Sequence, residues 1–233
     1  MRLYETELGD AKESLRASGW LSRCPTPFAA DVLAHSQWIR VDAGQPIALG
    51  GETDGGLFGV AQGTVGIMPA IAAPDIGLIH LNAAPFWFGL QPFVNGEGRQ
   101  ITVLARSACL VAHLPKPALT QILARHPDGW RLLLLHLTEM AALTVQGLAD
   151  LLLADRHRRC GAVILRLAGV RNPGSAPRDV HCSHEELGGM CNLSRASING
   201  VLRRFEAERL IEAGYRMIRV TDADRLRIIV DAS

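Results

Sequence analysis

Hydroxyl and acidic side chains near the C-terminus are spaced as they are at the start of a helix, and the residues that follow indicate contact with nucleic acid. Ser183 stands three residues before Glu186, which is the capping-box arrangement. Gly188 is small enough for two helices to cross closely, and Asn192 tolerates the positive φ that a tight turn requires. The spacing predicts a helix-turn-helix whose second helix covers residues 194–207.

The N-terminal half of that second helix is expected to contact DNA, because this end enters the major groove in helix-turn-helix proteins. Ile198, Val201, Leu202 and Phe205 would face inward. Arginine forms bidentate bonds to guanine edges, which makes Arg195 the strongest candidate for reading a base. The predicted DNA-binding residues are Ser183, Ser194, Arg195, Ala196, Ser197, Asn199, Arg203 and Arg216.

A hairpin wing is predicted directly after this helix. Two short strand-like runs, residues 210–212 and 217–220, flank a turn at Ala213-Gly214-Tyr215-Arg216. From such a hairpin, Arg216 and Arg219 would reach phosphates of the DNA backbone. The helix-turn-helix and the hairpin together predict a winged helix.

The charge distribution agrees with a DNA-reading module. Residues 1–155 contain 10 Lys and Arg against 14 Asp and Glu, whereas residues 156–233 contain 14 Arg against 9 Asp and Glu. A basic C-terminal portion behind an acidic one fits a nucleic-acid-binding domain attached to another domain.

The chain lacks the patterns of common catalytic and metal sites. Its five cysteines form no CxxC pair and no zinc spacing, so reduced thiols are expected. A β-rich domain with histidines could hold a cupin-like metal site, but no His-x-His motif with a spaced glutamate occurs, nor does a GxSxG or P-loop signature. We therefore expect neither an enzyme nor a metal site.

The elements that must position this module begin with a β-rich region between residues 38 and 114. Short apolar runs there are separated by glycine and proline, which is typical of a sandwich or barrel. A helical segment follows at residues 119–124 and stops at His126-Pro127. The main predicted strands are residues 38–41, 57–60, 63–67, 76–79, 100–104 and 108–113.

A long helix is predicted over residues 128–154, which contain no proline. At about 1.5 Å per residue it would be roughly 40 Å long, longer than a small domain is wide, so a dimer interface is favoured over burial within its own chain. Asp155 would cap the next helix, and residues 171–177 read as a loop. The apolar positions form two stripes, Leu133/Leu137/Met140/Thr144/Gly147/Leu151 and Leu134/Ala141/Val145/Leu148/Leu152.

This order predicts an α+β protein of three parts. Residues 1–126 would form a β-roll, or jelly-roll, effector-sensing domain, residues 127–154 a dimerisation helix, and residues 155–233 the winged helix. Glu139, Gln146 and Asp150 would be costly in lipid, so the long helix is not expected to cross a membrane. The first residues are acidic and lack the apolar core of a signal peptide, so a cytoplasmic location is expected.

The chain resembles the family of the cyclic-AMP receptor protein and the fumarate-and-nitrate-reduction regulator, the Crp/Fnr family, over almost its whole length. The resemblance rests on Val41-Asp42-Ala43-Gly44-Gln45-Pro46-Ile47, on Phe58-Gly59-Val60-Ala61-Gln62-Gly63-Thr64-Val65 and on the segment Leu193-Ser194-Arg195-Ala196-Ser197-Ile198-Asn199-Gly200-Val201-Leu202-Arg203-Arg204-Phe205-Glu206. It implies a cyclic-nucleotide-binding-like β-roll and a homodimer that binds two-fold symmetric DNA sites to regulate transcription.

The resemblance also locates a predicted effector pocket, formed by Phe88, Gly89, Leu90, Arg99, Gln100 and Thr144. Arg99 aligns with the arginine that holds the cyclic phosphate in the family, and Thr144 with a residue that contacts the base. However, residues 86–95 contain no carboxylate for the ribose hydroxyl, and Gln100 replaces a small hydroxyl residue. We therefore expect an effector other than cyclic AMP, or none.

Other family cofactors fit the sequence poorly. Only Cys24 precedes the β-roll, which argues against the N-terminal cysteine cluster of iron–sulfur members. Haem would need an axial ligand such as His80, His113 or His136, although a single histidine is more often a surface or core residue. The aromatic residues Phe86-Trp87-Phe88 with Phe93 could instead line an apolar pocket for a small apolar or aromatic effector.

The recognition helix departs from the pattern of the cyclic-AMP receptor protein. Ala196 stands where a base-reading glutamate is found in that pattern, and Gly200 where a second arginine is found. A different operator is expected. The expected partners are double-stranded DNA, a second copy of the chain and RNA polymerase. The alternative is a ligand-binding or protein-interaction module with a degenerate winged helix.

Overall fold

The computed structural model describes residues 5–70, 77–172 and 178–232. It divides into two compact units, the first made of residues 1–73 and 81–141 and the second of residues 74–80 and 142–233. The chain combines a β domain, a long helix and a C-terminal helix-turn-helix, which confirms the predicted α+β class.

Three helical segments precede the β domain, and the sequence pattern did not predict them. Ala11, Leu15, Trp20 and Phe28 contribute buried side chains to the core between these segments and the β strands. Ser14 Oγ donates a hydrogen bond to the carbonyl oxygen of Ala61 at 3.3 Å. The segments are α1 (Glu5–Ala17), the 3-10 helix η1 (Trp20–Arg23) and α2 (Thr26–Ala34).

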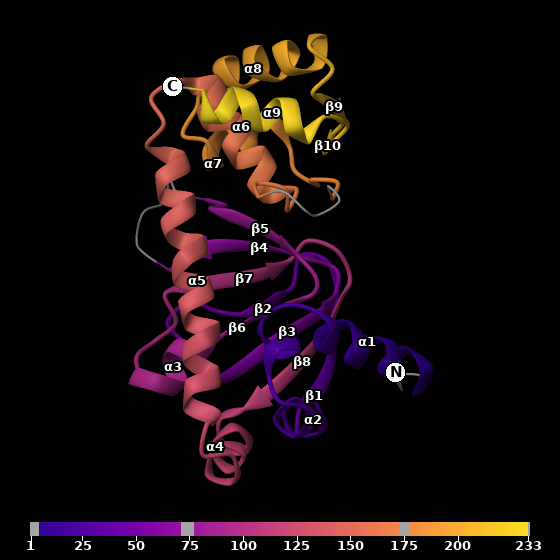
Figure 1. Ribbon diagram of the computed structural model, residues 1–233, viewed down its shortest axis with the longest axis vertical. Coiled ribbons are helices and arrows are strands. Elements are labelled where there is room, and N and C mark those ends of the chain that lie inside the picture. Colours follow the sequence, from indigo (N-terminus) through magenta and orange to yellow (C-terminus); the bar gives the residue numbers. More distant parts are fainter. Residues whose placement is uncertain (1–4, 71–76, 173–177, 233) are drawn as a thin grey trace. The chain divides into compact units, whose positions relative to one another are not determined.

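Two four-stranded sheets form the β domain (Figure 1). The strand pairs whose register is resolved are antiparallel, as expected for a roll built from hairpins. One sheet has the order β1 (Gln37–Val41), β8 (Cys109–Pro115), β3 (Gly56–Gln62), β6 (Phe86–Phe88), and the other has the order β2 (Pro46–Ala48), β7 (Ile101–Ala105), β4 (Thr64–Pro69), β5 (His80–Ala83).

Most predicted strands are confirmed within one to three residues, but the strand predicted at residues 76–79 is wrong over Gly77–Ile79. Ile76 itself lies outside the described residues. The strand β5 begins only at His80, and Leu81 is the residue of this strand that is buried. Ile79 is exposed, so the apolar composition of this run does not reflect burial in the sheet.

Three helices follow or interrupt the strands: α3 (Leu90–Asn95), α4 (Lys116–Arg125) and α5 (Gly129–Leu151). By length and composition alone, α5 could cross a membrane. Leu132 and Leu133 near its start are buried in the first unit. The exposed large apolar side chains of this helix are Trp130, Leu134, Leu135, Leu137, Leu143, Val145, Leu148 and Leu151.

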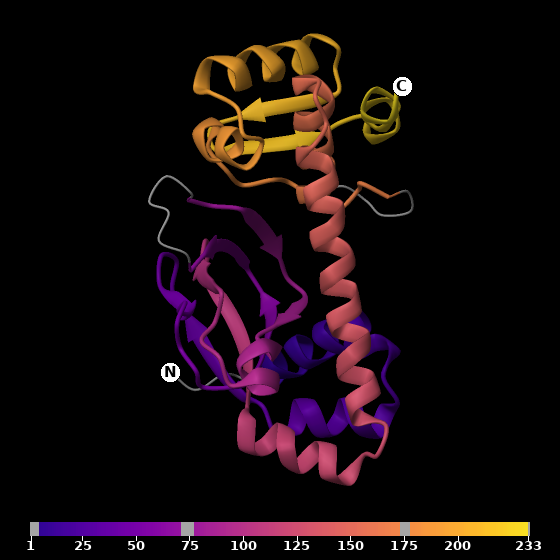
Figure 2. The ribbon, with the colours of Figure 1, turned by 90° about the vertical axis from the view of Figure 1, so that its left-hand side faces the viewer.

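The second unit contains the predicted winged helix. Figure 2 shows the two strands of its hairpin, β9 (Ile211–Gly214) and β10 (Met217–Val220), running in opposite directions. The predicted loop at residues 171–177 lies outside the described residues from Pro173 to Pro177. The helices of this unit are α6 (Arg156–Leu167), α7 (His184–Met190), α8 (Arg195–Ala207) and α9 (Ala223–Asp231), together with the end of α5.

Candidate nucleic-acid interface

The start of α7 is fixed by the predicted capping box. Ser183 Oγ accepts a hydrogen bond from the backbone N–H of Glu186 at 3.1 Å, and Glu186 Oε2 accepts one from the backbone N–H of Ser183 at 2.8 Å. This satisfies two amides that the first turn of a helix leaves unpaired. The Ser183 hydroxyl, which was predicted to contact DNA, is therefore also a structural group.

The turn between α7 and α8 depends on two positions that accept few types of side chain. Asn192 has a φ of 51°, which confirms the positive φ expected at this position. The backbone N–H of Leu193 donates to the carbonyl oxygen of Gly188 at 2.8 Å. A Cβ atom at Gly188 would lie 3.0 Å from the carbonyl oxygen of Leu193, so glycine allows the two helices to approach this closely.

The helix α8 has an apolar inner face and a polar outer face. Ser194 caps it by accepting from the backbone N–H of Ser197 at 3.3 Å, and its hydroxyl donates to Ser197 Oγ at 3.0 Å. The inner side chains Ile198, Val201, Leu202 and Phe205 are buried, as predicted. Their burial fixes the rotation of the helix and leaves Arg195, Ala196, Gly200 and Arg203 exposed.

Arg195 is available for a ligand. In the part of the chain that the structure describes, its guanidinium has no hydrogen-bond or ion-pair partner. Arg203 lies two helical turns further on. Its Nε donates a hydrogen bond to the carbonyl oxygen of Asn199 at 3.3 Å. Arg195, Asn199 and Arg203 follow one another at intervals of four residues, so they lie on one face of α8.

The two wing arginines predicted to contact phosphates differ in how firmly the domain holds them. Arg216, at the hairpin turn, has a φ of 52° and an exposed side chain 3.5 Å from the Glu186 carboxylate. Tyr215 beside it is 94% exposed. Arg219, in contrast, donates two hydrogen bonds to the Asp179 carboxylate at 2.8 and 2.7 Å, and this contact lowers the pKa of Asp179. Arg219 is thus bound within the domain.

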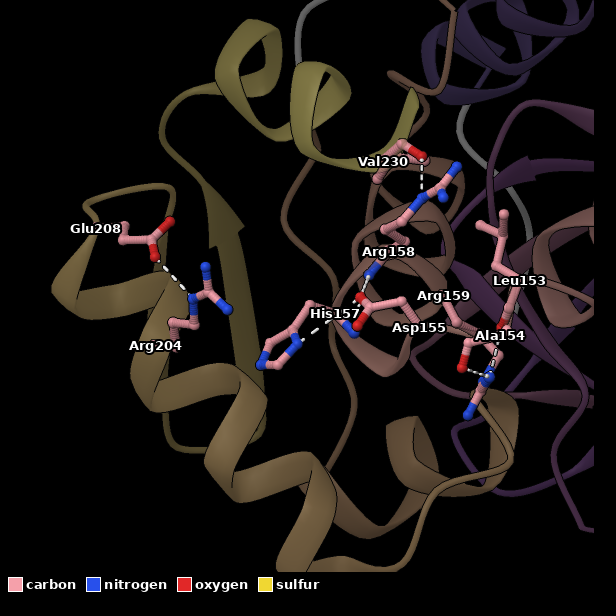
Figure 3. Close-up of polar contacts among 9 residues, drawn as sticks. All are labelled: Leu153, Ala154, Asp155, His157, Arg158, Arg159, Arg204, Glu208 and Val230. Carbon is pink, nitrogen blue, oxygen red and sulfur yellow. Dashed lines mark hydrogen bonds and ion pairs between the residues drawn. The ribbon is translucent and has the colours of Figure 1, made fainter. Parts of the chain in front are cut away.

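Other arginines of the second unit are held in the same way. Arg158 Nε donates to the Val230 carbonyl oxygen at 3.0 Å, and Arg204 Nε donates to Glu208 at 2.8 Å (Figure 3). Arg227 donates to the Val170 carbonyl oxygen. Much of the arginine charge in residues 156–233 therefore stabilises the domain, and only part of it is free to face DNA.

The junction between α5 and α6 is built from polar contacts. Asp155 caps α6 by accepting from the backbone N–H groups of His157 and Arg158 at 2.9 Å each, and these bonds hold the pKa of Asp155 below its usual value (Figure 3). Arg159 Nε donates to the Cys191 carbonyl oxygen at 2.8 Å. A terminal nitrogen of the same guanidinium donates to the backbone carbonyl oxygens of Leu153 and Ala154. One guanidinium thus connects this junction to the turn of the helix-turn-helix.

Sequence reasoning missed two contacts between helices or loops of this unit. His184 Nδ1 lies 2.8 Å from Asn199 Oδ1 and connects α7 to α8. The buried carboxylate of Asp150 lies within 3.4 Å of both Arg166 and Arg171. The partners are separated by 15 or more residues in the sequence, so no local sequence motif predicts these contacts. Only the assembled helices bring them together.

In the first unit, the structure brings three of the predicted pocket residues, Phe88, Gly89 and Arg99, together around Phe58. The Phe58 ring stacks on the Phe88 ring with centroids 5.2 Å apart, and the Arg99 guanidinium lies over Phe58 at 5.0 Å from its centroid. Gly89 has a φ of 105°, and a Cβ atom there would lie 3.0 Å from Phe58. Leu90, the first residue of α3, is buried in the other core cluster of this unit.

The two remaining predicted pocket residues are Gln100 and Thr144. Gln100 is exposed, and its backbone N–H donates to Gln91 Oε1 at 3.3 Å. Thr144 is on the part of α5 that belongs to the second unit. The structure therefore groups Phe88, Gly89 and Arg99 around Phe58, with Leu90 following them.

Arg99 is only 4% exposed and already faces acidic groups. Its terminal nitrogen donates to the Asp54 carbonyl oxygen at 2.6 Å, and the carboxylates of Glu52 and Asp54 each lie 3.9 Å from the guanidinium. Burial lowers the pKa of Arg99, and the two carboxylates oppose this shift. The positive charge that the family uses for a phosphate is therefore partly neutralised by the chain itself.

The four aromatic residues predicted to line one pocket do not face a common space. Phe86 and Phe88 contact one core cluster, whereas Trp87 between them belongs to the other, because side chains alternate along a strand. Phe93 stacks on Trp130, with ring centroids 5.7 Å apart. The shared aromatic pocket is therefore a wrong prediction.

The histidines that could serve as haem ligands occupy partly or fully buried positions. Burial lowers the pKa of His80 and of His136 to about 4 and also lowers that of His113, so all three are neutral at neutral pH. His113 stacks on Phe58 with centroids 4.4 Å apart. Within residues 5–70, 77–172 and 178–232, no three His, Cys, Asp or Glu side chains are grouped to hold a metal ion.

Known proteins resemble this chain in its helix-turn-helix domain and over most of its length. Residues 158–229 match the model of the Crp-like helix-turn-helix domain. The chain is 24% identical over 189 residues to the cAMP-activated global transcriptional regulator CRP of Escherichia coli O6:H1, covering 80% of this chain and 90% of the relative. It is 23% identical over 193 residues to CRP of Pasteurella multocida, with the same coverage.

Solved structures share the fold. The c-di-GMP responsive global regulator CLP of Xanthomonas campestris superposes with a TM-score of 0.65 at 20% identity, covering 84% of this chain and 99% of that one. A CRP-family transcriptional regulator of Thermus thermophilus gives a TM-score of 0.65 at 21% identity, covering 84% and 97%. Residues 158–229 therefore belong to the Crp-like helix-turn-helix domain family, and the relatives and the fold support membership of the whole chain in the Crp/Fnr family of transcription regulators.

Proposed function

We propose that the chain is a homodimeric, sequence-specific DNA-binding regulator of transcription. The observation that carries this proposal is the outer face of α8, where the Arg195 guanidinium is exposed and has no partner among the described residues, although many arginines of the same unit are bound internally. An unpaired arginine at the N-terminal end of a recognition helix is suited to guanine in the major groove.

An exposed apolar face along α5 supports the homodimer. It continues to Leu152, the residue that follows the last residue of this helix. Leu134, Val145, Leu148 and Leu152 lie on one predicted helical stripe and are 58% to 75% exposed in a single chain. A contiguous apolar surface of this kind is typical of a protein interface. Pairing of two α5 helices would cover it and would present two copies of α8 to a two-fold symmetric site.

The β domain supports control by a small effector other than cyclic AMP. The CRP proteins of Escherichia coli and Pasteurella multocida are cAMP-activated, but residues 86–95 of this chain offer no carboxylate to a ribose hydroxyl, and Arg99 is flanked by Glu52 and Asp54. A buried hydroxyl without a partner would cost about 1–3 kcal/mol. The surroundings of Phe58, Phe88 and Arg99 remain the proposed effector site.

The proposal includes a cytoplasmic location, with double-stranded DNA, a second copy of the chain and RNA polymerase as partners. Family relatives are transcription regulators, which supports this location and argues against catalysis. The carboxylate of Asp150 near the end of α5 is engaged by two arginines, which fits a helix in a protein interior or interface better than one in lipid.

Binding-site selection tests the function. The purified full-length chain is mixed with a random DNA pool at a stated salt concentration, and the selection is repeated with metabolites of a cell extract. We expect a two-fold symmetric motif containing a guanine in each half-site, and a gain in binding where an effector is present. Weak, salt-sensitive binding without a motif would contradict the proposal and favour an interaction module with a degenerate winged helix.

A further inference from the structure

The side chains of His184 and Asn199 join the two helices of the helix-turn-helix at the edge of the proposed DNA-binding face. His184 Nδ1 lies 2.8 Å from Asn199 Oδ1. An amide oxygen only accepts hydrogen bonds, so Nδ1 carries the hydrogen and donates it. The same bond fixes the rotation of the Asn199 amide, because its oxygen must point toward His184.

The amide nitrogen of Asn199 consequently points away from His184. It makes no hydrogen bond with the described residues, and it is not among the buried polar atoms that lack a partner, so solvent reaches it. An amide nitrogen carries two hydrogens and donates only. Asn199 therefore offers a fixed donor on the helix face that also carries Arg195 and Arg203.

The neighbouring positions leave this donor unobstructed. Ala196 has only a methyl group, and the space around an added Cβ at Gly200 is empty within 4 Å. Both residues are exposed. A flat stretch of helix lets a DNA duplex approach closely, so the short side chain of Asn199 can reach it.

We propose that His184 is a positioning residue that orients Asn199 as a hydrogen-bond donor toward an acceptor on DNA. The inference rests on the proposed function. The acceptor is either an acceptor atom on a base edge or a backbone phosphate oxygen. Bidentate reading of adenine, which uses both the oxygen and the nitrogen of asparagine, is disfavoured because His184 engages the oxygen.

Four variants of the full-length chain test the pair. Asn199→Asp keeps an oxygen for His184 but replaces the donor with an acceptor, whereas Asn199→Ala removes both. His184→Gln keeps a side-chain donor, whereas His184→Phe keeps the ring shape without one. His181→Gln is the control, since His181 is exposed and precedes the capping box. Thermal unfolding of each variant shows whether it is folded.

We expect Asn199→Asp to bind the wild-type site at least about tenfold more weakly than wild type, and more weakly than Asn199→Ala, because a carboxylate repels both kinds of acceptor. His184→Phe should lose most of the Asn199 contribution, and His184→Gln should restore it. A purely structural contact would instead lower the unfolding temperature and leave the ranking of DNA sites unchanged.

Two arms of the experiment identify the acceptor. If it is a base edge, Asn199→Ala loses the preference at one position of each half-site. If it is a phosphate, replacing that phosphate with a neutral methylphosphonate weakens the wild type but not Asn199→Ala. Equal affinity and an equal motif for folded Asn199→Asp and wild type would overturn the inference alone. A wild-type chain that selects no motif would overturn the proposed function itself.

Discussion

Arg166 Nε donates to the carboxylate of Asp150 at 3.2 Å, and the Asp150 side chain is only 3% exposed. Arg171 lies 3.4 Å from the other carboxylate oxygen and also 3.1 Å from Asp231 at the end of α9. Within the second unit, this network joins the end of α5 to α6 and α9. A buried charge of this kind is sensitive to the loss of one partner.

Replacing Asp150 with asparagine should therefore destabilise the protein strongly. The substitution keeps the shape but leaves Arg166 and Arg171 without their shared counter-charge, at a cost of about 3 kcal/mol. Urea unfolding of Asp150→Asn and wild type measures the difference. Glu208→Gln, which breaks the exposed pair with Arg204, is the matched control and should change little. Equal midpoints for Asp150→Asn and wild type would contradict this account.

The cap of α6 should depend on an oxygen acceptor at position 155. We expect Asp155→Ala to lower the free energy of unfolding by about 1 kcal/mol at neutral pH, whereas Asp155→Asn should retain most of the cap. The pKa of Asp155 is lowered in the folded protein, so its stabilisation is present above the unfolded pKa and is lost as pH falls through the folded value. The gap between Asp155→Ala and wild type should accordingly narrow under acid. A gap independent of pH would be inconsistent with the charged cap.

Arg195 should determine one base of the operator. We expect Arg195→Ala to weaken binding to the selected site by about 1–3 kcal/mol and to relax the preference at one position of each half-site. Fluorescence anisotropy and repeated site selection measure both effects. Arg204→Ala controls for the loss of a positive charge on the same helix, since Arg204 pairs with Glu208. An unchanged motif for Arg195→Ala would argue against its role as a base reader.

His136 should make the stability of the first unit depend on pH. Burial lowers its pKa to about 4, and its ring lies 5.4 Å from that of Trp20. Between this value and the unfolded pKa of about 6.5, the unfolded chain binds a proton that the folded chain does not, so stability falls as pH decreases through this window. His136→Leu should reduce the loss by on the order of 3 kcal/mol, whereas His181→Gln should not. Parallel pH profiles for His136→Leu and wild type would refute the assignment.

Cyclic AMP should bind poorly. The missing ribose acceptor costs about 1–3 kcal/mol, and each loss of roughly 1.4 kcal/mol corresponds to a tenfold loss of affinity. Isothermal titration calorimetry of the folded, full-length chain is expected to show no micromolar binding. A micromolar dissociation constant would mean that another group replaces the absent carboxylate.

The parts of the fold that depend on local sequence were predictable. The capping box at Ser183, the Asp155 cap and the positive φ of Asn192 each follow from one residue and its neighbours, and the structure confirms all three. The helix α1 was missed because it buries only Ala11 and Leu15, and α2 because it is only nine residues long; both pack against β strands distant in sequence.

The sequence predicted which residues lie at the site, but it did not predict which side chains contact one another there. Spacing alone placed Arg195 and Arg203 on the outer face of α8. It could not show that Arg219 is bound to Asp179 or that His184 holds Asn199, because these contacts join residues 40 and 15 positions apart. Composition likewise grouped Phe86, Trp87 and Phe88, although strand alternation sends Trp87 to the opposite side.

The internal pairing of so many arginines limits how many counterions the protein displaces from DNA. Each phosphate neutralised contributes roughly −0.9 to the slope of log affinity against log salt. Because Arg195 is assigned to a base, Arg203 and Arg216 are the exposed arginines of the proposed interface that remain for phosphates. A slope of about −2 for each protomer follows, far shallower than a slope counted from all the arginines of the unit. Affinity for random DNA would then be low at physiological ionic strength, and most discrimination would come from the few contacts that α8 makes with its operator.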